Sequence, residues 1–285
     1  MIDGGPRVES WPASDGYPIH VAVWPTSGTP RGRVVVLHGV QSHGGWYHNL
    51  GRTLAEAGFE AHFPDRRGSG ANRVDRGHTP SSDRLLADVS EYLLGIRDRE
   101  PVAPTTLAGI SWGGKLAVVI AGRKPGLVDA LALICPGLHP RVGVSRGERW
   151  EIALAYFLQP RKTFPIPLSD PSLFTDNPEA RTFIANDPLG LHAATARLLA
   201  ASVFIDRAVR RIAPRVRQPA LLMLAGRDRI IDNERTRDYF RRLASARKDV
   251  VSYPEGHHTL EFDPDPSRYA RDLIAWLGEV FGARG

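Results

Sequence analysis

Short apolar runs alternate with amphipathic segments along most of the chain. The runs 33–39 and 130–136 are mostly apolar without alternation, which is typical of strands that are buried on both faces of a sheet. Between 83 and 97 the apolar residues recur every three or four positions, so they share one face of a helix. A regular succession of such strands and helices predicts a parallel sheet with helices on both faces.

The remaining elements follow the same two patterns. The segments 7–11 and 20–24 alternate between apolar and polar residues and predict an antiparallel hairpin that opens the sheet. Further strands are expected at 60–65, 105–108, 220–225 and 249–253, and further helices at 46–57, 115–121, 233–243 and 267–281. The chain is therefore expected to be an α/β protein with a mostly parallel, eight-stranded sheet.

The regular succession stops between residues 137 and 219. This segment is rich in prolines and aromatic residues, its longest helical stretch runs from about 192 to 212, and no strand is evident in it. We therefore predict that 1–136 and 220–285 form the core and that 137–219 is an inserted, mostly helical lid over one edge of the sheet. The alternative is that the segment simply adds to the outer layer of helices.

The composition fits a single large globular domain. The chain has 285 residues, of which 42% are hydrophobic and 24% charged. No apolar run approaches the roughly 20 residues that cross a bilayer, and residues 1–7 contain no signal-peptide pattern. The default expectation is a cytoplasmic protein whose single cysteine, Cys135, is a buried core residue without a disulfide.

The net charge of +6 comes from arginines that are spread along the chain and interleaved with acidic residues. A basic balance is common in proteins that bind nucleic acids or anionic membranes. The densest cluster, 207–217, is better explained as the solvated face of a helix, and no nucleic-acid recognition motif accompanies it. We expect no nucleic-acid partner and only weak peripheral membrane contact, and the sequence leaves the oligomeric state open.

A Gly-x-Ser-x-Gly pattern covers residues 109–113, between an apolar run and a helix-forming segment. Because Gly109 and Gly113 have no side chains, the strand and the helix can approach closely while the Ser111 hydroxyl points outward over the sheet edge. Such a short pattern also arises by chance in an ordinary turn with a solvated serine. The rest of the chain has to decide between these interpretations.

A serine hydroxyl becomes a nucleophile when a base lies within hydrogen-bond reach and a carboxylate orients that base. In a parallel sheet these groups belong at the carboxyl ends of the strands. Asp228 follows the strand that ends at residue 225, and His257 and His258 follow the strand that ends at residue 253. The candidate groups therefore occur in the order serine, aspartate, histidine.

This order, the serine-containing turn and the strand–helix succession resemble the α/β-hydrolase fold, and more closely the monoacylglycerol lipase and lysophospholipase group of serine hydrolases. The segment 38–47 matches the pattern H-G-x-x-x-H-x-x-x-Y of that group, and 65–70 matches D-x-R-G-x-G. The segments 226–232 and 256–261 fit its acid and histidine motifs. Ile110 and Trp112 stand where lipases of the group commonly have histidine and methionine, which leaves the preferred acyl chain open.

The resemblance implies a role for each residue of the site. Ser111 would be the nucleophile, His258 the general base and Asp228 the carboxylate that orients it. The backbone N–H groups of Val40 and Trp112 would form the oxyanion hole.

Neighbouring residues are expected to support this site. His258 is preferred to His257 because it matches the family histidine before the Thr-Leu-Glu stretch, so His257 becomes a wall residue. His38 and Gly39 would shape the oxyanion loop, with Asp65 and Arg67 bracing it. Asp232 is the fallback acid, although an N-cap explains it adequately.

The sequence predicts neither a metal nor a cofactor. His38 and His43 are five positions apart and lack an acidic companion, which disfavours a zinc site. The predicted function is that of a serine carboxylesterase or lipase that cleaves apolar esters, such as monoacylglycerols or lysophospholipids, through an acyl-enzyme on Ser111. A peptidase, a carbon–carbon bond hydrolase and an acyltransferase share the same triad and stay open, whereas a non-catalytic binding protein is disfavoured because the triad is complete.

Overall fold

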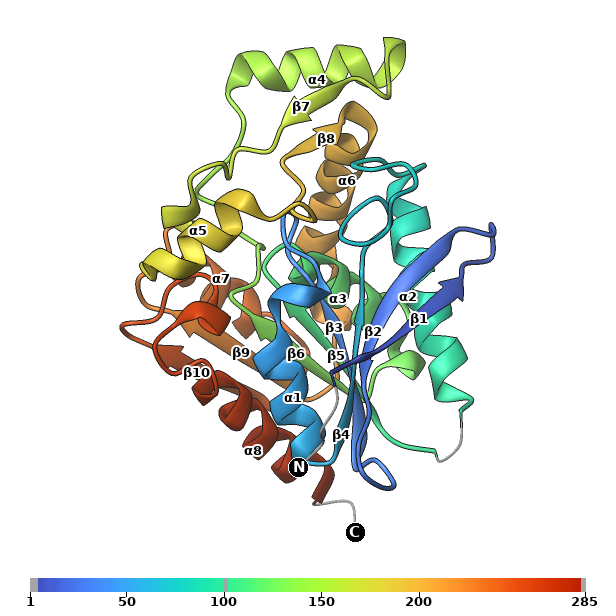
Figure 1. The fold of residues 1–285 in the computed structure, drawn as a ribbon, viewed down its shortest axis with the longest axis vertical. Coiled ribbons are helices and arrows are strands. Elements are labelled where there is room, and N and C mark those ends of the chain that lie inside the picture. The colour runs from blue at the N-terminus through green and yellow to red at the C-terminus, as the bar shows by residue number, and fades with distance from the viewer. Residues whose placement is uncertain (1–4, 100–101, 283–285) are drawn as a thin grey trace.

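An eight-stranded sheet runs through the molecule and is covered by helices on both faces, as the computed structural model of residues 5–99 and 102–282 shows (Figure 1). The strands lie in the order β1-β2-β4-β3-β5-β6-β9-β10. Their bounds are β1 (Arg7–Pro12), β2 (Pro18–Trp24), β3 (Gly32–Leu37), β4 (Phe59–Pro64), β5 (Thr105–Ile110), β6 (Ala130–Ile134), β9 (Ala220–Ala225) and β10 (Lys248–Tyr253). β2 pairs antiparallel with β1 and β4, and the other pairs are parallel. The predicted fold class and hairpin are confirmed.

The helices around the sheet form two layers. On one face α1 (His48–Glu56) contacts α8 (Arg268–Gly282), and on the other α3 (Gly113–Arg123) contacts α2 (Ser82–Arg97). The remaining helix of the predicted core is α7 (Asn233–Arg241). Local capping explains where these helices begin, since the Ser81 and Asp232 side chains accept hydrogen bonds from the first turns of α2 and α7.

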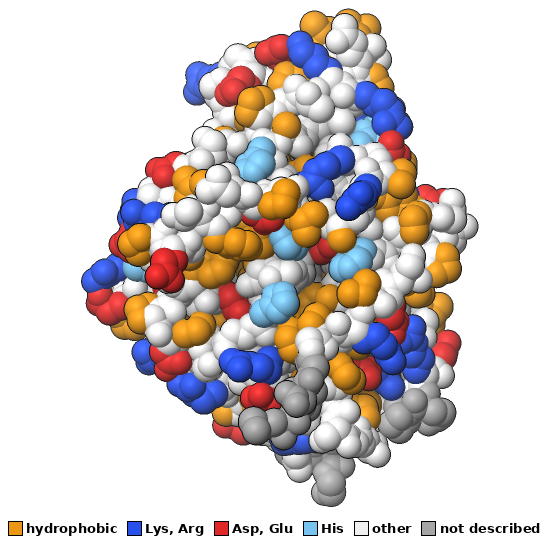
Figure 2. Space-filling view, in the orientation of Figure 1, with side chains coloured by type: hydrophobic (Ala, Val, Ile, Leu, Met, Phe, Trp, Pro, Cys, Tyr) orange, Lys and Arg blue, Asp and Glu red, His pale blue; other side chains and the backbone are white. Residues whose placement is uncertain are grey.

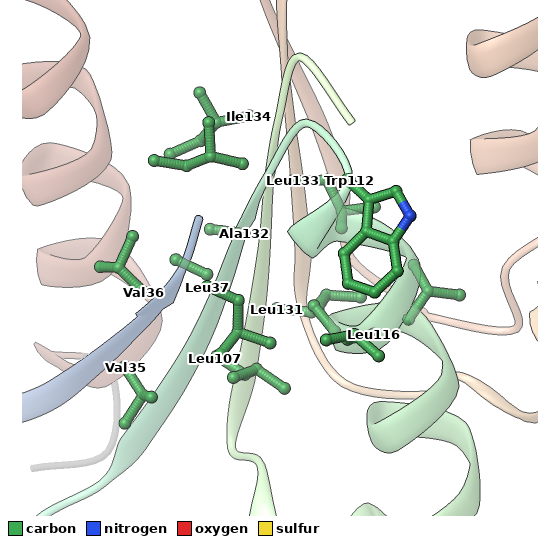
Figure 3. Packing of buried hydrophobic residues seen from close by; sticks show 14 of the residues in the cluster. Val35, Val36, Leu37, Leu107, Trp112, Leu116, Leu131, Ala132, Leu133 and Ile134 are labelled. Carbon is green, nitrogen blue, oxygen red and sulfur yellow. The ribbon is translucent and has the colours of Figure 1, made fainter. Parts of the chain in front are cut away.

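The centre of the core lies between β3, β5 and β6 and the start of α3. Leu107 and Leu131 are fully buried, and Trp112 and Leu116 pack at the first turn of α3 (Figure 3). Burying an aliphatic side chain of this size contributes about 1.5–3 kcal/mol. This packing fixes the ends of the central strands, where the candidate site residues lie. Cys135 directly follows β6 and is buried, as predicted.

Residues 137–219, here called the 137–219 segment, contain α4 (Arg146–Leu158), β7 (Thr163–Pro165), α5 (Pro178–Asn186), β8 (Ala193–Thr195) and α6 (Ala196–Ile212). β7 and β8 form a separate antiparallel sheet, so the expectation that the segment lacks strands is wrong. Each has only three residues, which is too few for an alternation to be recognised. α6 packs on α3, whereas α4 projects away from the sheet (Figure 1). That this segment is a lid stays a prediction.

Two observations bear on the expected location. Among the described residues, no helix combines the length and the apolar character that crossing a membrane requires. Residues 1–4, which belong to the stretch without a signal-peptide pattern, lie outside the described part of the chain.

Candidate active site

Ser111 lies at the turn between β5 and α3 in a strained backbone conformation. Its φ of 51° falls in the left-handed region, which costs a residue with a side chain about 1–3 kcal/mol. A Cβ at Gly109 would lie 2.6 Å from Gly114 Cα, and one at Gly113 would lie 2.1 Å from the Leu37 carbonyl oxygen. Both glycines are therefore required by close backbone approach, as the sequence pattern predicted.

Backbone hydrogen bonds hold this turn in place. Ser111 N–H donates to the Ile134 carbonyl at 3.0 Å, and the Ser111 carbonyl accepts from Gly114 at 2.9 Å and from Gly137 at 2.7 Å. The serine is thus tied to the strand β6, to its own helix and to the first residue of the 137–219 segment. These three hydrogen bonds compensate for the backbone strain at Ser111.

His258 lies between Ser111 and Asp228. Its Nε2 is 2.8 Å from Ser111 Oγ, and its Nδ1 is 2.8 Å from Asp228 Oδ2. Because an ionised carboxylate only accepts hydrogen bonds, Nδ1 carries the ring proton and Nε2 accepts from the serine hydroxyl. Asp228 is itself oriented, since its Oδ1 accepts from the N–H groups of Ile230 at 2.8 Å and Ile231 at 3.0 Å.

The adjacent histidine points elsewhere. His257 Nε2 lies 2.8 Å from Asp176 Oδ2, and its Nδ1 lies 3.3 Å from Asp263 Oδ1. Asp232, the fallback acid, caps α7 by accepting from Arg235 N–H at 3.1 Å. The structure therefore brings Ser111, His258 and Asp228 together and leaves His257 and Asp232 with other partners.

The loop after β3 approaches Ser111 from the other side. A Cβ at Gly39 would lie 3.4 Å from Ser111 Cβ, so this loop is in direct contact with the nucleophile candidate. Gly39 N–H donates to Ser42 Oγ at 3.0 Å. In the described part of the chain, the N–H groups of Val40 and Trp112 donate no hydrogen bond to the protein. Both remain available to a ligand oxygen at Ser111.

His38 is a neutral residue that supports this loop. Burial and the nearby Arg66 guanidinium lower the pKa of His38 to about 3. Its Nε2 accepts from Arg66 N–H at 2.8 Å, so Nδ1 carries the proton and donates to the Gly39 carbonyl, also at 2.8 Å. His38 thus contacts the loop that it was predicted to shape, and its role in the site stays a prediction.

A pocket of about 270 Å³ lies at Ser111. Val40 and Trp46 line it from the side of the core, and Leu168 and Phe174 line it from the 137–219 segment. Polar side chains line the pocket beside Ser111 as well: Gln41, Ser42, His258 and Thr259. Polar groups and apolar walls are therefore combined there, as in a small-molecule site.

His43 belongs to a link between the loop and the 137–219 segment. Its Nε2 lies 3.0 Å from Asp187 Oδ2, and Trp46 Nε1 donates to the same oxygen at 2.7 Å. Among the described residues no cluster of three or more His, Cys, Asp or Glu side chains has the arrangement of a metal site. The sequence analysis did not predict this role of Asp187. A buried acidic residue needs partners, but its burial becomes visible only in the structure.

The residues after β4 contact partners that differ in part from the predicted ones. Asp65 does brace the loop, because its Oδ1 accepts from Gly44 N–H at 2.8 Å. Arg67 turns away and binds Asp88 on α2 through two hydrogen bonds of 2.9 and 2.7 Å. Arg66, which the sequence analysis did not single out, contacts the oxyanion loop instead.

A parallel sheet with a serine on a tight strand–helix turn, followed in the chain by an aspartate and a histidine, defines the class of α/β-hydrolase fold serine hydrolases. The chain belongs to the family described as serine aminopeptidase, S33, whose model matches residues 28–265.

Relatives of known name extend over nearly the whole chain. The monoacylglycerol lipase of Mycolicibacterium smegmatis is 26% identical over 97% of this chain and 99% of its own length. The monoglyceride lipase of Mus musculus is 25% identical over 95% of this chain and 90% of its own. The predicted resemblance to monoacylglycerol lipases is confirmed.

Solved structures agree with this result. The Paleococcus ferrophilus monoacylglycerol lipase superimposes with a TM-score of 0.81 at 25% identity, covering 92% of this chain and 99% of its own. A monoglyceride lipase from Saccharomyces cerevisiae reaches 0.85 at 19% identity, covering 98% and 97%, and so supports the fold alone. Although the family is named for a peptidase, these relatives support ester hydrolysis by an enzyme of the carboxylesterase and lipase type.

Proposed function

We propose that the protein hydrolyses monoacylglycerols or closely similar esters of apolar acyl chains, with Ser111 as the nucleophile. The observation that carries the proposal is the hydrogen-bonded series from Ser111 Oγ through His258 to Asp228, with 2.8 Å at each step. Two observations support this substrate class. The relatives that match over nearly their whole length are named as monoacylglycerol or monoglyceride lipases, and the apolar side chains of Leu168 and Phe174 line the pocket.

The chemistry follows from these contacts. Ser111 Oγ attacks the ester carbonyl carbon while its proton passes to His258 Nε2, and Asp228 stabilises the imidazolium that forms. The N–H groups of Val40 and Trp112 bind the oxyanion of the tetrahedral intermediate. When the intermediate collapses, His258 returns the proton to the leaving alcohol. A water molecule then releases the acid from Ser111 by the same steps.

The test measures hydrolysis of monoacylglycerols and of p-nitrophenyl esters with short, medium and long acyl chains, by wild type and Ser111→Ala. We expect activity that rises with chain length and is lost in the variant. An aminoacyl p-nitroanilide cleaved faster than every ester would favour a peptidase, and transfer to an added alcohol would favour an acyltransferase. Full ester hydrolysis by Ser111→Ala would refute the proposed nucleophile.

We also propose that the 137–219 segment is a lid over Ser111 and that α4 makes weak peripheral contact with membranes. Large apolar side chains of α4 are exposed and recur at helical spacing: Trp150 is 80%, Leu154 61%, Phe157 79% and Leu158 69% exposed. α4 lies at the top of the molecule in Figure 1, where Figure 2 shows apolar side chains on the surface. Arg146 and Arg149 lie in the same helix beside Glu148 and Glu151, so the charge of α4 is balanced. The exposed apolar face favours contact with a lipid surface, and the net charge of +6 of the chain favours an anionic one.

Flotation with anionic and zwitterionic vesicles tests this contact. We expect wild type to float with anionic vesicles and Trp150→Ala/Phe157→Ala to lose that binding while it still cleaves a soluble ester. Equal flotation of both proteins would contradict the membrane role of α4. A cytoplasmic location and the absence of a cofactor or a nucleic-acid partner stay predictions.

A further inference from the structure

Arg66 holds the loop 38–40 at three points. Its Nη1 donates to the Gly39 carbonyl at 3.0 Å and its Nη2 donates to the Val40 carbonyl at 2.8 Å. Its backbone N–H donates to His38 Nε2 at 2.8 Å. The forked guanidinium thus binds two consecutive carbonyl groups, which a single-headed donor such as lysine does not match.

Holding the Gly39 carbonyl also sets the direction of the Val40 N–H. The two groups belong to one planar peptide unit and point in opposite directions, so fixing the oxygen fixes the hydrogen. The Gly39 oxygen accepts from both His38 Nδ1 and Arg66 Nη1. These two bonds orient a peptide whose N–H group is the first proposed donor of the oxyanion hole.

Arg66 contacts the second proposed donor as well. Its guanidinium carbon lies 5.0 Å from the centroid of the Trp112 indole, in a cation–π arrangement. The far edge of the indole is fixed by a hydrogen bond from Nε1 to Ser202 Oγ at 2.9 Å. The Trp112 side chain is therefore held between the guanidinium and α6.

No carboxylate is in direct contact with the Arg66 guanidinium, and only the through-space attraction of the neighbouring Asp65 favours its charge among the described residues. Arg66 is 9% exposed and forms no ion pair within the described residues, and its Nε has no hydrogen-bond partner there. Arg67, at the next position, pairs with both Asp88 and Asp15. A buried cation without a directly paired carboxylate is costly in the resting protein.

We propose that Arg66 is the positioning residue of the oxyanion hole and that the oxyanion of the intermediate adds a negative charge that stabilises the buried guanidinium. Arg66 orients the peptide that carries the Val40 N–H, and its guanidinium packs on the face of the Trp112 indole. The inference rests on the proposed function, because it concerns the step in which Ser111 attacks the ester.

The test compares Arg66→Met with Arg67→Met, because both remove a buried guanidinium at neighbouring positions. With p-nitrophenyl butyrate we expect Arg66→Met to lower kcat by about 10- to 100-fold, with KM within about threefold of wild type. Arg67→Met should lower the melting temperature through loss of its ion pairs and leave kcat unchanged. Equal kcat losses in the two variants would contradict a specific role for Arg66.

The binding of two inhibitors distinguishes an effect of Arg66 on the oxyanion hole from an effect on the stability of the protein. A trifluoromethyl ketone accepts Ser111 Oγ at its carbonyl carbon, the serine proton passes to His258, and the product carries an oxyanion. The matching methyl ketone binds without that step. We expect Arg66→Met to weaken the fluorinated inhibitor by the same factor as kcat/KM and to leave the methyl ketone unaffected. Equal weakening of both inhibitors, or of neither, overturns the proposal.

Two further variants keep the test decisive if Arg66→Met does not fold. Arg66→Gln keeps one donor without the charge, and Arg66→Lys keeps the charge without the fork. Both should lose kcat less than the Met variant, and a folded Arg66→Gln with wild-type kcat refutes the proposal. Ser111→Ala is measured in parallel: activity there refutes the proposed nucleophile, whereas its inactivity beside fully active Arg66 variants refutes only the role of Arg66.

Discussion

The turn at Ser111 and the 137–219 segment lie on opposite sides of one pocket, but different contacts hold them. At the turn, the backbone of α3 packs directly against the backbone of β3, and a Cβ at Gly113 would lie only 2.1 Å from the Leu37 carbonyl oxygen. The segment meets the core through backbone hydrogen bonds, such as that from Leu191 N–H to the Gln41 carbonyl at 2.9 Å, and through side chains such as Asp187, and it leaves Trp150 80% exposed. Close backbone packing allows Ser111 a single geometry, whereas hydrogen bonds and side-chain contacts leave the sequence of the segment less constrained.

Two adjacent histidines test this difference most directly, because His258 faces Ser111 and His257 faces Asp176 of the segment. We expect His258→Ala to lower kcat by about 10⁴- to 10⁶-fold, as removal of a triad base does elsewhere. His257→Ala should keep kcat within about tenfold, because the hydrogen bonds of this ring go to Asp176 and Asp263 and not to Ser111. Steady-state kinetics on p-nitrophenyl butyrate checks both values. A larger loss in His257→Ala would reverse the assignment of the base.

The next largest effect is expected at Gly113. Gly113→Ala forces a methyl group against the Leu37 carbonyl, so we expect the free energy of unfolding to fall by about 3 kcal/mol or more. Gly126→Ala is the matched control, because a Cβ there meets nothing within 4 Å. Urea denaturation measures both. If Gly113→Ala matches its control, backbone approach is not what fixes the turn.

A third prediction concerns pH and the buried Glu261, whose carboxylate joins the start of α1 to Tyr269 of α8. Burial raises the pKa of Glu261 from 4.5 to about 7. The unfolded chain thus releases this proton near pH 4.5 and the folded chain near pH 7, so between these values the folded state binds more protons. The free energy of unfolding therefore falls as the pH rises through this window, by roughly 2–3 kcal/mol from this group.

Glu261→Gln should remove this part of the pH dependence, because the amide does not titrate. Urea denaturation of wild type and variant at several pH values between 4.5 and 7 gives the difference. Glu279→Gln on α8 is the control, since that side chain is 68% exposed. Parallel pH profiles for wild type and Glu261→Gln would show that Glu261 is already ionised in the folded protein.

Sequence patterns predicted the strands, the helices and the turn at Ser111 because periodicity and turn glycines act over a few residues. Asp228 and the pair of histidines followed from the rule that ligands bind at the carboxyl ends of strands, and the choice of His258 over His257 came from the resemblance to the family. The catalytic roles of these residues stay predictions until the variants are measured.

The roles of Arg66 and Asp187 depend on contacts between distant parts of the chain, which no local pattern reveals. Arg66 lies beside Arg67 in the sequence, yet one side chain turns toward Gly39 and the other toward Asp88. The choice follows from where the loop after β3 and the helix α2 lie in space. Only the folded structure supplies that information.

Asp187 tests the same difference within the 137–219 segment, where we expect only a modest change. Asp187→Asn weakens the hydrogen bonds from His43 and Trp46, and Leu189 N–H, now bound at Oδ1 at 3.0 Å, would face the amide nitrogen. Losing a charged acceptor for buried donors costs about 1–3 kcal/mol. We therefore expect a lower melting temperature and faster cleavage within 137–219 by trypsin.

Asp170→Asn is the control, because this carboxylate lies in the same segment and binds only Ser172 in the described structure. If side chains such as Asp187 hold the segment, cleavage accelerates in Asp187→Asn and not in Asp170→Asn, while the turn at Ser111 keeps its geometry. Labelling of Ser111 by a fluorophosphonate probe should then proceed in Asp187→Asn within about tenfold of the wild-type rate. Loss of labelling together with faster cleavage would mean that the segment and the turn are one unit, and the contrast between them would fail.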